Sequence, residues 1–135
     1  MRRIRLGLVG LGALCLWSCA RPAATPLGVY RGRLTLAKDD GGNLPYVDRT
    51  LQPDVYFRVT LKDAPVGRRL PLSCAWLDPA GGLAHQNVYT TLEVTKPVWE
   101  THCHWLIGTA AVAGTRKVEL SNEGRVLLTH PFEVR

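Results

Sequence analysis

The sequence predicts an all-β fold, a single antiparallel β-sandwich of about seven strands that follows an N-terminal signal peptide. Three observations lead to this prediction. From Val29 onward the apolar residues recur with period two, which is the period of a strand with one face on a core. Turn residues separate these short apolar segments about every eight to twelve positions. No window of the same region carries the apolar stripe of an amphipathic helix.

Residues 1–18 are interpreted as the signal peptide and are set aside from the fold. Arg2, Arg3 and Arg5 precede an uncharged apolar run from Leu6 to Trp17, which is the order of a basic n-region and an apolar h-region. A helix of this length rises about 18 Å, whereas the hydrocarbon core of a bilayer is roughly 30 Å thick. The segment is therefore predicted to direct export rather than to remain as a membrane span.

The leader ends in Leu16-Trp17-Ser18-Cys19, and these residues resemble a bacterial lipobox. The resemblance implies cleavage before Cys19, diacylglycerol on its thiol, and acyl chains such as palmitate at the new N-terminus. Cysteine suits this chemistry because its thiolate is a good nucleophile. Two or three acyl chains would hold the protein on a membrane, at about 0.8 kcal/mol per buried methylene. The alternatives are an ordinary secretory signal cut nearby and a short apolar N-terminus with no processing.

Residues 19–28 are expected to form a lipidated tether, and residues 29–135 the folded domain. The tether is short and contains Pro22 and Pro26, so the domain is expected to lie close to the bilayer. In lipoproteins of two-membrane bacteria, an aspartate after the lipidated cysteine marks inner-membrane retention. This chain has Ala20 there, so the resemblance favours the outer membrane facing the periplasm, with the cell surface as the alternative.

The charge balance argues against a nucleic-acid partner. The chain carries 17 basic and 11 acidic residues. Three of the basic residues lie in the leader, which leaves 14 against 11 in the mature part. This net charge is mild, and the basic residues are scattered rather than clustered. The mature part has the length of one domain and can bury a core.

In the first half of the domain, the alternation assigns three strands. Tyr30, Leu34 and Leu36 are expected to share one face of the first strand, which the turn residues 39–43 end. The inward residues of the next two strands are expected to be Val55, Phe57, Val59 and Leu61, then Leu70, Leu72, Cys74 and Trp76.

The second half supplies a fourth strand, a fifth strand and a final hairpin. The residues expected to point inward are Val88, Leu92 and Val94, then Cys103, Trp105 and Ile107, then Val118, Leu120, Val126, Leu128, Phe132 and Val134. The hairpin connection Asn122-Glu123-Gly124 fits a short loop with Gly124 in the left-handed conformation.

Trp76 precedes an Asp-Pro-x-Gly turn at 78–81, and the last hairpin runs from Gly114-Thr115 to Phe132-Glu133-Val134. With the segment 55–59, these residues resemble immunoglobulin-like domains of bacterial envelope proteins. The resemblance implies an immunoglobulin-like β-sandwich. It says little about function, because such domains host many roles.

Cys74 and Cys103 are expected to form a disulfide. Both lie on inward faces, each two residues before a tryptophan, and an exported chain meets oxidising conditions. Two buried free thiols are the alternative.

His102 and His104 are candidate metal ligands, but a polar sheet face is the favoured interpretation. In a regular strand both side chains point away from Cys103, so a third ligand would have to come from elsewhere. No metal or other cofactor is therefore expected. No enzyme is expected either, because neither of the two serines after the leader, Ser73 and Ser121, lies in a Gly-x-Ser-x-Gly turn.

The leading functional hypothesis is a non-catalytic, lipid-anchored module that binds or scaffolds another envelope protein. Its candidate contact residues are Tyr46, in the long 39–53 loop, and Trp99, an aromatic outside the apolar alternation. One alternative is a component of a secretion or surface machine. The other is a metal or small-ligand carrier that uses His102 and His104.

Overall fold

The computed structural model describes residues 25–135. The predicted signal peptide, the lipobox cysteine Cys19 and most of the predicted tether lie outside the described residues. In the described part, no helix has the length and hydropathy needed to span a membrane.

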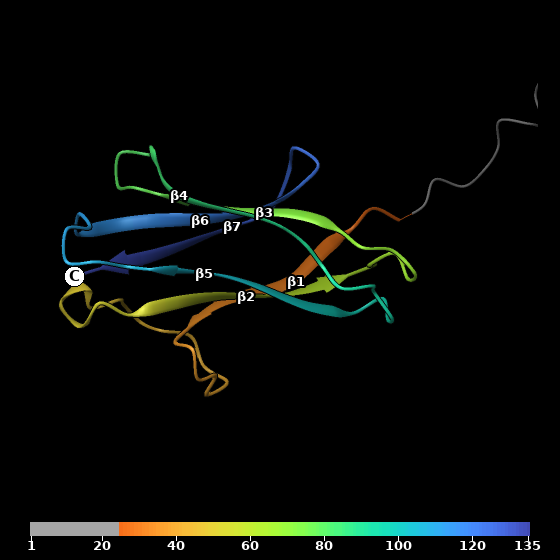
Figure 1. The fold of residues 1–135 in the computed structure, drawn as a ribbon, viewed down its shortest axis with the longest axis horizontal. Helices are drawn as coiled ribbons and strands as arrows, with labels where there is room; N and C mark the ends of the chain where they lie inside the picture. Colours follow the sequence, from red (N-terminus) through yellow and green to blue (C-terminus); the bar gives the residue numbers. More distant parts are fainter. Residues whose placement is uncertain (1–24) are drawn as a thin grey trace, which may run out of the picture.

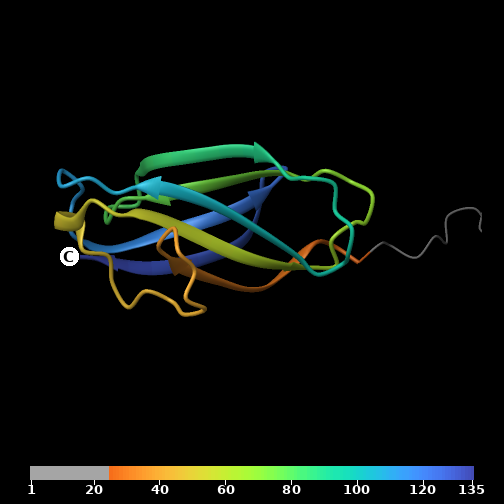
Figure 2. The same cartoon turned by 60° about the horizontal axis from the view of Figure 1, so that its bottom comes forward.

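Within the described residues, seven strands form two antiparallel sheets that face each other (Figures 1 and 2). The strands are β1 (Gly28–Thr35), β2 (Asp54–Lys62), β3 (Pro71–Leu77), β4 (Leu83–Thr90), β5 (Trp99–Leu106), β6 (Gly114–Asn122) and β7 (Arg125–Val134), with a single 3-10 turn, η1 (Arg49–Leu51), before β2. One sheet has the order β1-β2-β5 and the other β4-β3-β6-β7. The predicted sandwich of about seven strands is therefore confirmed.

The strand order differs in one respect from that of constant-type immunoglobulin domains. In those domains the fourth strand joins the sheet of the first two strands. Here β4 pairs with β3 instead, with Leu72 opposite Tyr89 and Trp76 opposite His85. As a result β4 and β5 are edge strands of opposite sheets, and they lie on the same side of the sandwich.

The core lies between the sheets and is built mainly from the inward faces of the central strands. Phe57 and Trp76 are fully buried, and the Trp76 and Phe132 rings lie nearly perpendicular, with 5.9 Å between their centroids. Large-to-small changes at such sites destabilise domains by several kcal/mol, about 3 to 5 for an aromatic residue. The inward residues predicted for β2 and β3 are confirmed, and all eight are buried.

A disulfide joins the two sheets, as predicted. It links Cys74 on β3 to Cys103 on β5, with a Cα–Cα distance of 6.5 Å. In antibody domains the inter-sheet disulfide links the second and sixth strands. The bond here instead connects β3, which pairs with the edge strand β4, to β5, the edge strand of the opposite sheet.

Five residues predicted to point inward are exposed. Val88 is 78% and Leu92 74% exposed, because β4 turns His85, Asn87 and Tyr89 toward the partner sheet and ends at Thr90. The remaining three exposed residues are Tyr30, Leu36 and Val126.

Two register shifts in the strand pairing explain why two of these three residues are exposed. A register shift between Val29 and Arg31 reverses the alternation in β1, so Tyr30 faces outward. A second shift, between Leu120 and Ser121, does the same near the start of β7, where Val126 lies. Leu36 comes directly after β1 has ended.

The β6–β7 connection has the predicted conformation. Asn122 pairs with Arg125, and the two residues between them, Glu123 and Gly124, both have positive φ angles of 49° and 80°. This is the type I′ geometry whose twist matches a two-stranded ribbon.

Candidate functional site

The long connection between β1 and β2 forms an open, mainly apolar hollow of about 560 Å³. Its walls include Leu36, Leu44, Tyr46, Leu51 and Pro53. Leu51 is 75% exposed. Exposed apolar side chains grouped in a concave surface are typical of binding sites rather than of ordinary protein surface.

Backbone hydrogen bonds across the sandwich hold this connection in place. The Val47 amide donates to the Glu133 carbonyl at 2.8 Å, and the Arg135 amide donates to the Val47 carbonyl at 2.9 Å. Val47 thereby makes a parallel bridge to Val134 at the end of β7. Nearer β1, the Leu44 amide donates to the Leu34 carbonyl at 2.9 Å.

The two carboxylates of the hollow already have partners. Asp48 caps η1 by accepting hydrogen bonds from the Thr50 amide at 3.0 Å and from the Thr50 hydroxyl at 2.6 Å. These bonds lower the pKa of Asp48. The Asp54 carboxylate accepts a hydrogen bond from His104 Nδ1 at 2.9 Å. Since a carboxylate can only accept, this contact places a ring proton of His104 on Nδ1. The hollow therefore offers apolar contact more than acid–base chemistry.

Tyr46, one of the two predicted contact residues, lines this hollow. The Arg135 guanidinium lies over its ring, with the Cζ atom 4.2 Å from the ring centroid. A cation at this distance is attracted to the face of the aromatic ring. Tyr46 as a whole is 40% exposed.

Trp99 lies elsewhere. It is the first residue of β5 and pairs with Leu61 at the end of β2, whereas the start of β2, Asp54, pairs with Leu106. Trp99 is half-buried and packs against the core. The structure thus places the two candidate contact residues at opposite ends of the domain, and they do not form one site.

His102 and His104 lie on the outer face of the β1-β2-β5 sheet, pointing away from Cys103 as predicted. Tyr56 lies beside both rings, stacked on His104 at 4.9 Å and tilted against His102 at 5.5 Å. Burial and the nearby charges of Arg58 and His104 lower the pKa of His102. Within residues 25–135, no group of three His, Cys, Asp or Glu side chains is arranged to hold a metal ion.

Next to the histidines, an ion cluster ties the 36–53 connection to the same sheet. Asp39 forms a two-pronged salt bridge with Arg33 and lies 3.7 Å from Arg58. The Arg33 guanidinium, followed by the Gly41 amide, holds the pKa of the Asp39 carboxyl well below its usual range. Sequence reasoning missed this cluster, although two arginines at matching positions of paired strands were a usable signal.

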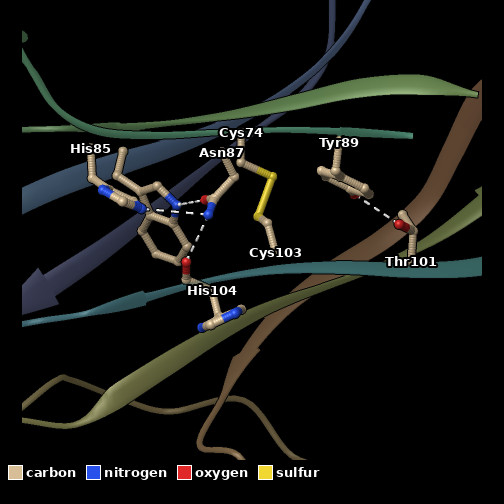
Figure 3. The surroundings of a disulfide bond; sticks show 8 residues. Cys74, His85, Asn87, Tyr89, Thr101, Cys103 and His104 are labelled. Carbon is tan, nitrogen blue, oxygen red and sulfur yellow. Dashed lines mark hydrogen bonds between the residues drawn. A yellow bond between two sulfur atoms is a disulfide. The ribbon is translucent and has the colours of Figure 1, made fainter. Parts of the chain in front are cut away.

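A polar network surrounds the disulfide and joins β4 to β5 (Figure 3). The indole N–H of Trp76 donates to Asn87 Oδ1 at 2.8 Å, and Asn87 Nδ2 donates to the His104 carbonyl at 3.0 Å. The Tyr89 and Thr101 hydroxyls are hydrogen-bonded at 2.8 Å. Burial raises the pKa of the Tyr89 phenol. These bonds explain why β4 turns polar residues inward.

No protein-family model matches this chain, and no curated protein matches it. Among solved structures, it is similar to the alkylpurine DNA glycosylase AlkC of Pseudomonas fluorescens bound to DNA containing an abasic site analog. The TM-score is 0.55 and the identity 16%, over 81% of this chain and 30% of the glycosylase.

The chain is also similar to an immunoglobulin-like protein from Pseudomonas aeruginosa. Here the TM-score is 0.54 and the identity 16%, over 84% of this chain and 100% of that protein. At such identities the likeness concerns the fold alone. Together with the two antiparallel sheets, it defines the described chain as an immunoglobulin-like β-sandwich.

Proposed function

We propose that this protein is a lipid-anchored, non-catalytic module of the bacterial envelope that holds another envelope protein through the hollow of the 36–53 connection. Lipid attachment at Cys19 is part of this proposal, and its support is the lipobox-like sequence. The observation that carries the binding role is the preformed apolar hollow with Tyr46 and Leu51 on its surface.

The position of the hollow supports this role. It lies beside Val134, at the end of the sandwich where β7 finishes. Thr25, where the described chain begins, lies beside Arg68 and Arg69 at the other end (Figure 1). An anchor at Cys19 would therefore leave the hollow directed away from the bilayer and open to a partner.

The chemistry of the hollow supports a binding role over catalysis. Catalytic sites usually combine a cleft with titratable groups tuned for proton transfer. In this hollow, Asp48 is held by Thr50 and Asp54 by His104. Apolar side chains make up the remaining surface, which suits a protein partner with exposed apolar residues.

Site-specific photo-crosslinking in intact cells tests the proposal. A photoreactive amino acid at Leu51 is expected to capture one dominant envelope protein, identified by mass spectrometry. Leu36→Asp, which places a charge in the same hollow, is expected to abolish that capture. If the captured protein belongs to a secretion or surface machine, the protein is a component of that machine.

A matched probe controls for random collision. Val88 is as exposed as Leu51 but lies on β4, away from the hollow. A probe at Val88 is expected to capture little of the same partner. Equal capture from Leu51 and Val88, or capture unaffected by Leu36→Asp, would show that the hollow is not the contact surface.

A further inference from the structure

The end of the domain nearest Thr25 is formed by two loops that act as one unit. The β2–β3 loop covers residues 63–70 and the β4–β5 loop residues 91–98. The Ala64 amide donates to the Pro97 carbonyl at 2.9 Å, the Gly67 amide to the Val94 carbonyl at 2.8 Å, and the Val94 amide to the Arg68 carbonyl at 2.8 Å. We call residues 62–70 and 91–98 the tether-end surface.

The tether-end surface carries exposed apolar side chains at its loops. Leu92 is 74%, Val66 57% and Val98 47% exposed. Tyr30 is exposed beside them, with the Lys62 ammonium 5.6 Å from its ring centroid. Apolar side chains and aromatic residues next to lysines are the composition found where proteins meet a membrane interface.

The same surface is positively charged, while the opposite end is not. Residues 62–70 and 91–98 contain four basic side chains, Lys62, Arg68, Arg69 and Lys96, against two acidic ones, Asp63 and Glu93. At the opposite end, residues 36–53 and 78–82 contain two basic side chains, Lys38 and Arg49, against four acidic ones, Asp39, Asp40, Asp48 and Asp78. This asymmetry matches an anionic lipid surface at the tether end.

The chain length before Thr25 limits how far this surface can be from an anchor. Arg125 Nη2 donates to the Leu27 carbonyl at 2.6 Å and fixes the point where the chain enters the domain. Thr25 lines a small pocket at this end of the domain together with Arg68, Arg69 and Leu70. Five residues lie between Cys19 and Thr25, so the two are six residue steps apart, a span of at most about 21 Å.

We propose that the tether-end surface rests on an anionic phospholipid bilayer, with Val66, Leu92 and Val98 in the headgroup region and the basic side chains facing lipid phosphates. This inference rests on the proposed anchoring at Cys19. The bilayer contact fixes the orientation of the domain and directs the hollow of the 36–53 connection away from the membrane.

The test is photo-crosslinking to lipid in intact cells grown with radiolabelled phosphate. A photoreactive amino acid at Leu92 is expected to form radiolabelled phospholipid adducts. The same probe at Leu83, an exposed leucine at the start of β4 on the opposite end, is expected to form none. Adducts from Leu92 to protein alone, or equal lipid labelling from Leu92 and Leu83, would overturn the proposal.

Charge reversal tests the electrostatic part separately. Arg68→Glu with Arg69→Glu is expected to reduce lipid adducts at Leu92. Lys38→Glu with Lys117→Glu changes the net charge equally at exposed sites outside the surface and is expected to leave the adducts unchanged. Equal effects of the two pairs would overturn a specific basic surface.

Mass spectrometry of the N-terminal peptide separates failure of this inference from failure of the anchor. If Cys19 carries acyl chains and Leu92 forms no lipid adduct, the orientation is wrong while the anchoring stands. If Cys19 carries none and Leu92 forms no adduct, the anchoring has failed and the orientation with it.

Discussion

Arg116 is a charged side chain placed inside the sandwich. It is 3% exposed, and its Nε and Nη2 atoms donate to the Val112 carbonyl at 3.0 and 2.7 Å. Its Cζ atom lies 5.7 Å from the Trp105 ring centroid. Within residues 25–135, its Nη1 atom has no hydrogen-bond partner. Burial lowers the pKa of the guanidinium, because the charged form loses solvation at this site.

Replacing Arg116 by an apolar side chain of similar length should therefore have little effect on stability. We expect Arg116→Met to change the free energy of unfolding by less than about 1 kcal/mol, because the lost hydrogen bonds are offset by removing a buried charge. Arg116→Ala should lower it by about 2 kcal/mol, because a cavity remains. Urea denaturation of the two variants measures both values. If both variants lose the same free energy of unfolding, the charge of Arg116 itself stabilises the fold.

Two histidines should make the domain less stable in mild acid. Burial lowers the pKa of His130, and burial with nearby positive charges lowers that of His102. Below the ordinary histidine pKa of about 6.5, the unfolded chain therefore binds protons that the folded chain does not. The free energy of unfolding should fall as the pH drops below this value.

The double variant His102→Gln, His130→Gln tests this pH dependence. Its urea midpoint should vary less between about pH 7 and pH 5 than that of the unaltered chain. The lowered pKa of Asp39 acts in a lower pH range. Its stabilising contribution is complete above the ordinary aspartate pKa of about 4 and is lost in stronger acid. If the urea midpoint changes equally with pH in both proteins, the loss of stability in mild acid comes from other groups.

Among the elements, β4 shows why alternation alone does not fix which face of a strand is buried. Val88 was predicted to point inward because it is apolar. Asn87 and Tyr89 are the partly buried residues instead, since Trp76 and Thr101 satisfy their hydrogen bonds. The central strands β2 and β3 were predictable because their apolar and polar residues alternate without conflict.

A pair of matched substitutions checks this assignment of β4. Val88→Asp should change the free energy of unfolding by less than about 0.5 kcal/mol, because the side chain faces solvent. Val59→Asp on β2 should prevent folding, because it would bury an unpaired carboxylate in the core. Thermal unfolding by circular dichroism distinguishes the two. Strong destabilisation by Val88→Asp would contradict the position of β4.

The disulfide that joins the two sheets should contribute strongly to the stability of the domain. Its two cysteines are 29 residues apart, and closing such a loop stabilises a fold by about 3 to 4 kcal/mol in the chain-entropy model. The double variant Cys74→Ala, Cys103→Ala should lose about this much, measured by urea denaturation. Adding a reductant should lower the stability of the unaltered chain and leave that of the double variant unchanged.

For the whole molecule, the hollow of the 36–53 connection could not be read from local sequence. The length of the loop and the aromatic Tyr46 identified the region. Its shape depends on Val47 pairing with Val134 and on Arg135 lying over Tyr46, contacts between distant parts of the chain. Period-two patterns report which residues form strands, and they carry no information about such contacts.

These contacts predict where a fusion can be placed. A fluorescent protein joined directly after Arg135 should reduce partner capture by a probe at Leu51, because it crowds the hollow. The same protein inserted between Ala80 and Gly81, in the exposed β3–β4 turn of the opposite sheet at the same end, should reduce capture less. Crosslinking yields in cells compare the two. Equal capture would place the contact surface away from β7.

The Cys74–Cys103 disulfide also limits how far the domain can be extended by a mechanical force. A pull applied between the N-terminal and C-terminal ends of the described chain would put its strands under tension. The closed loop withholds 29 residues from extension, about 100 Å of contour length at about 3.5 Å per residue. Stretching could separate β1 or β7 from their neighbours, but β3 and β5 would stay linked. The domain would yield over a short distance and retain a nucleus from which it could refold.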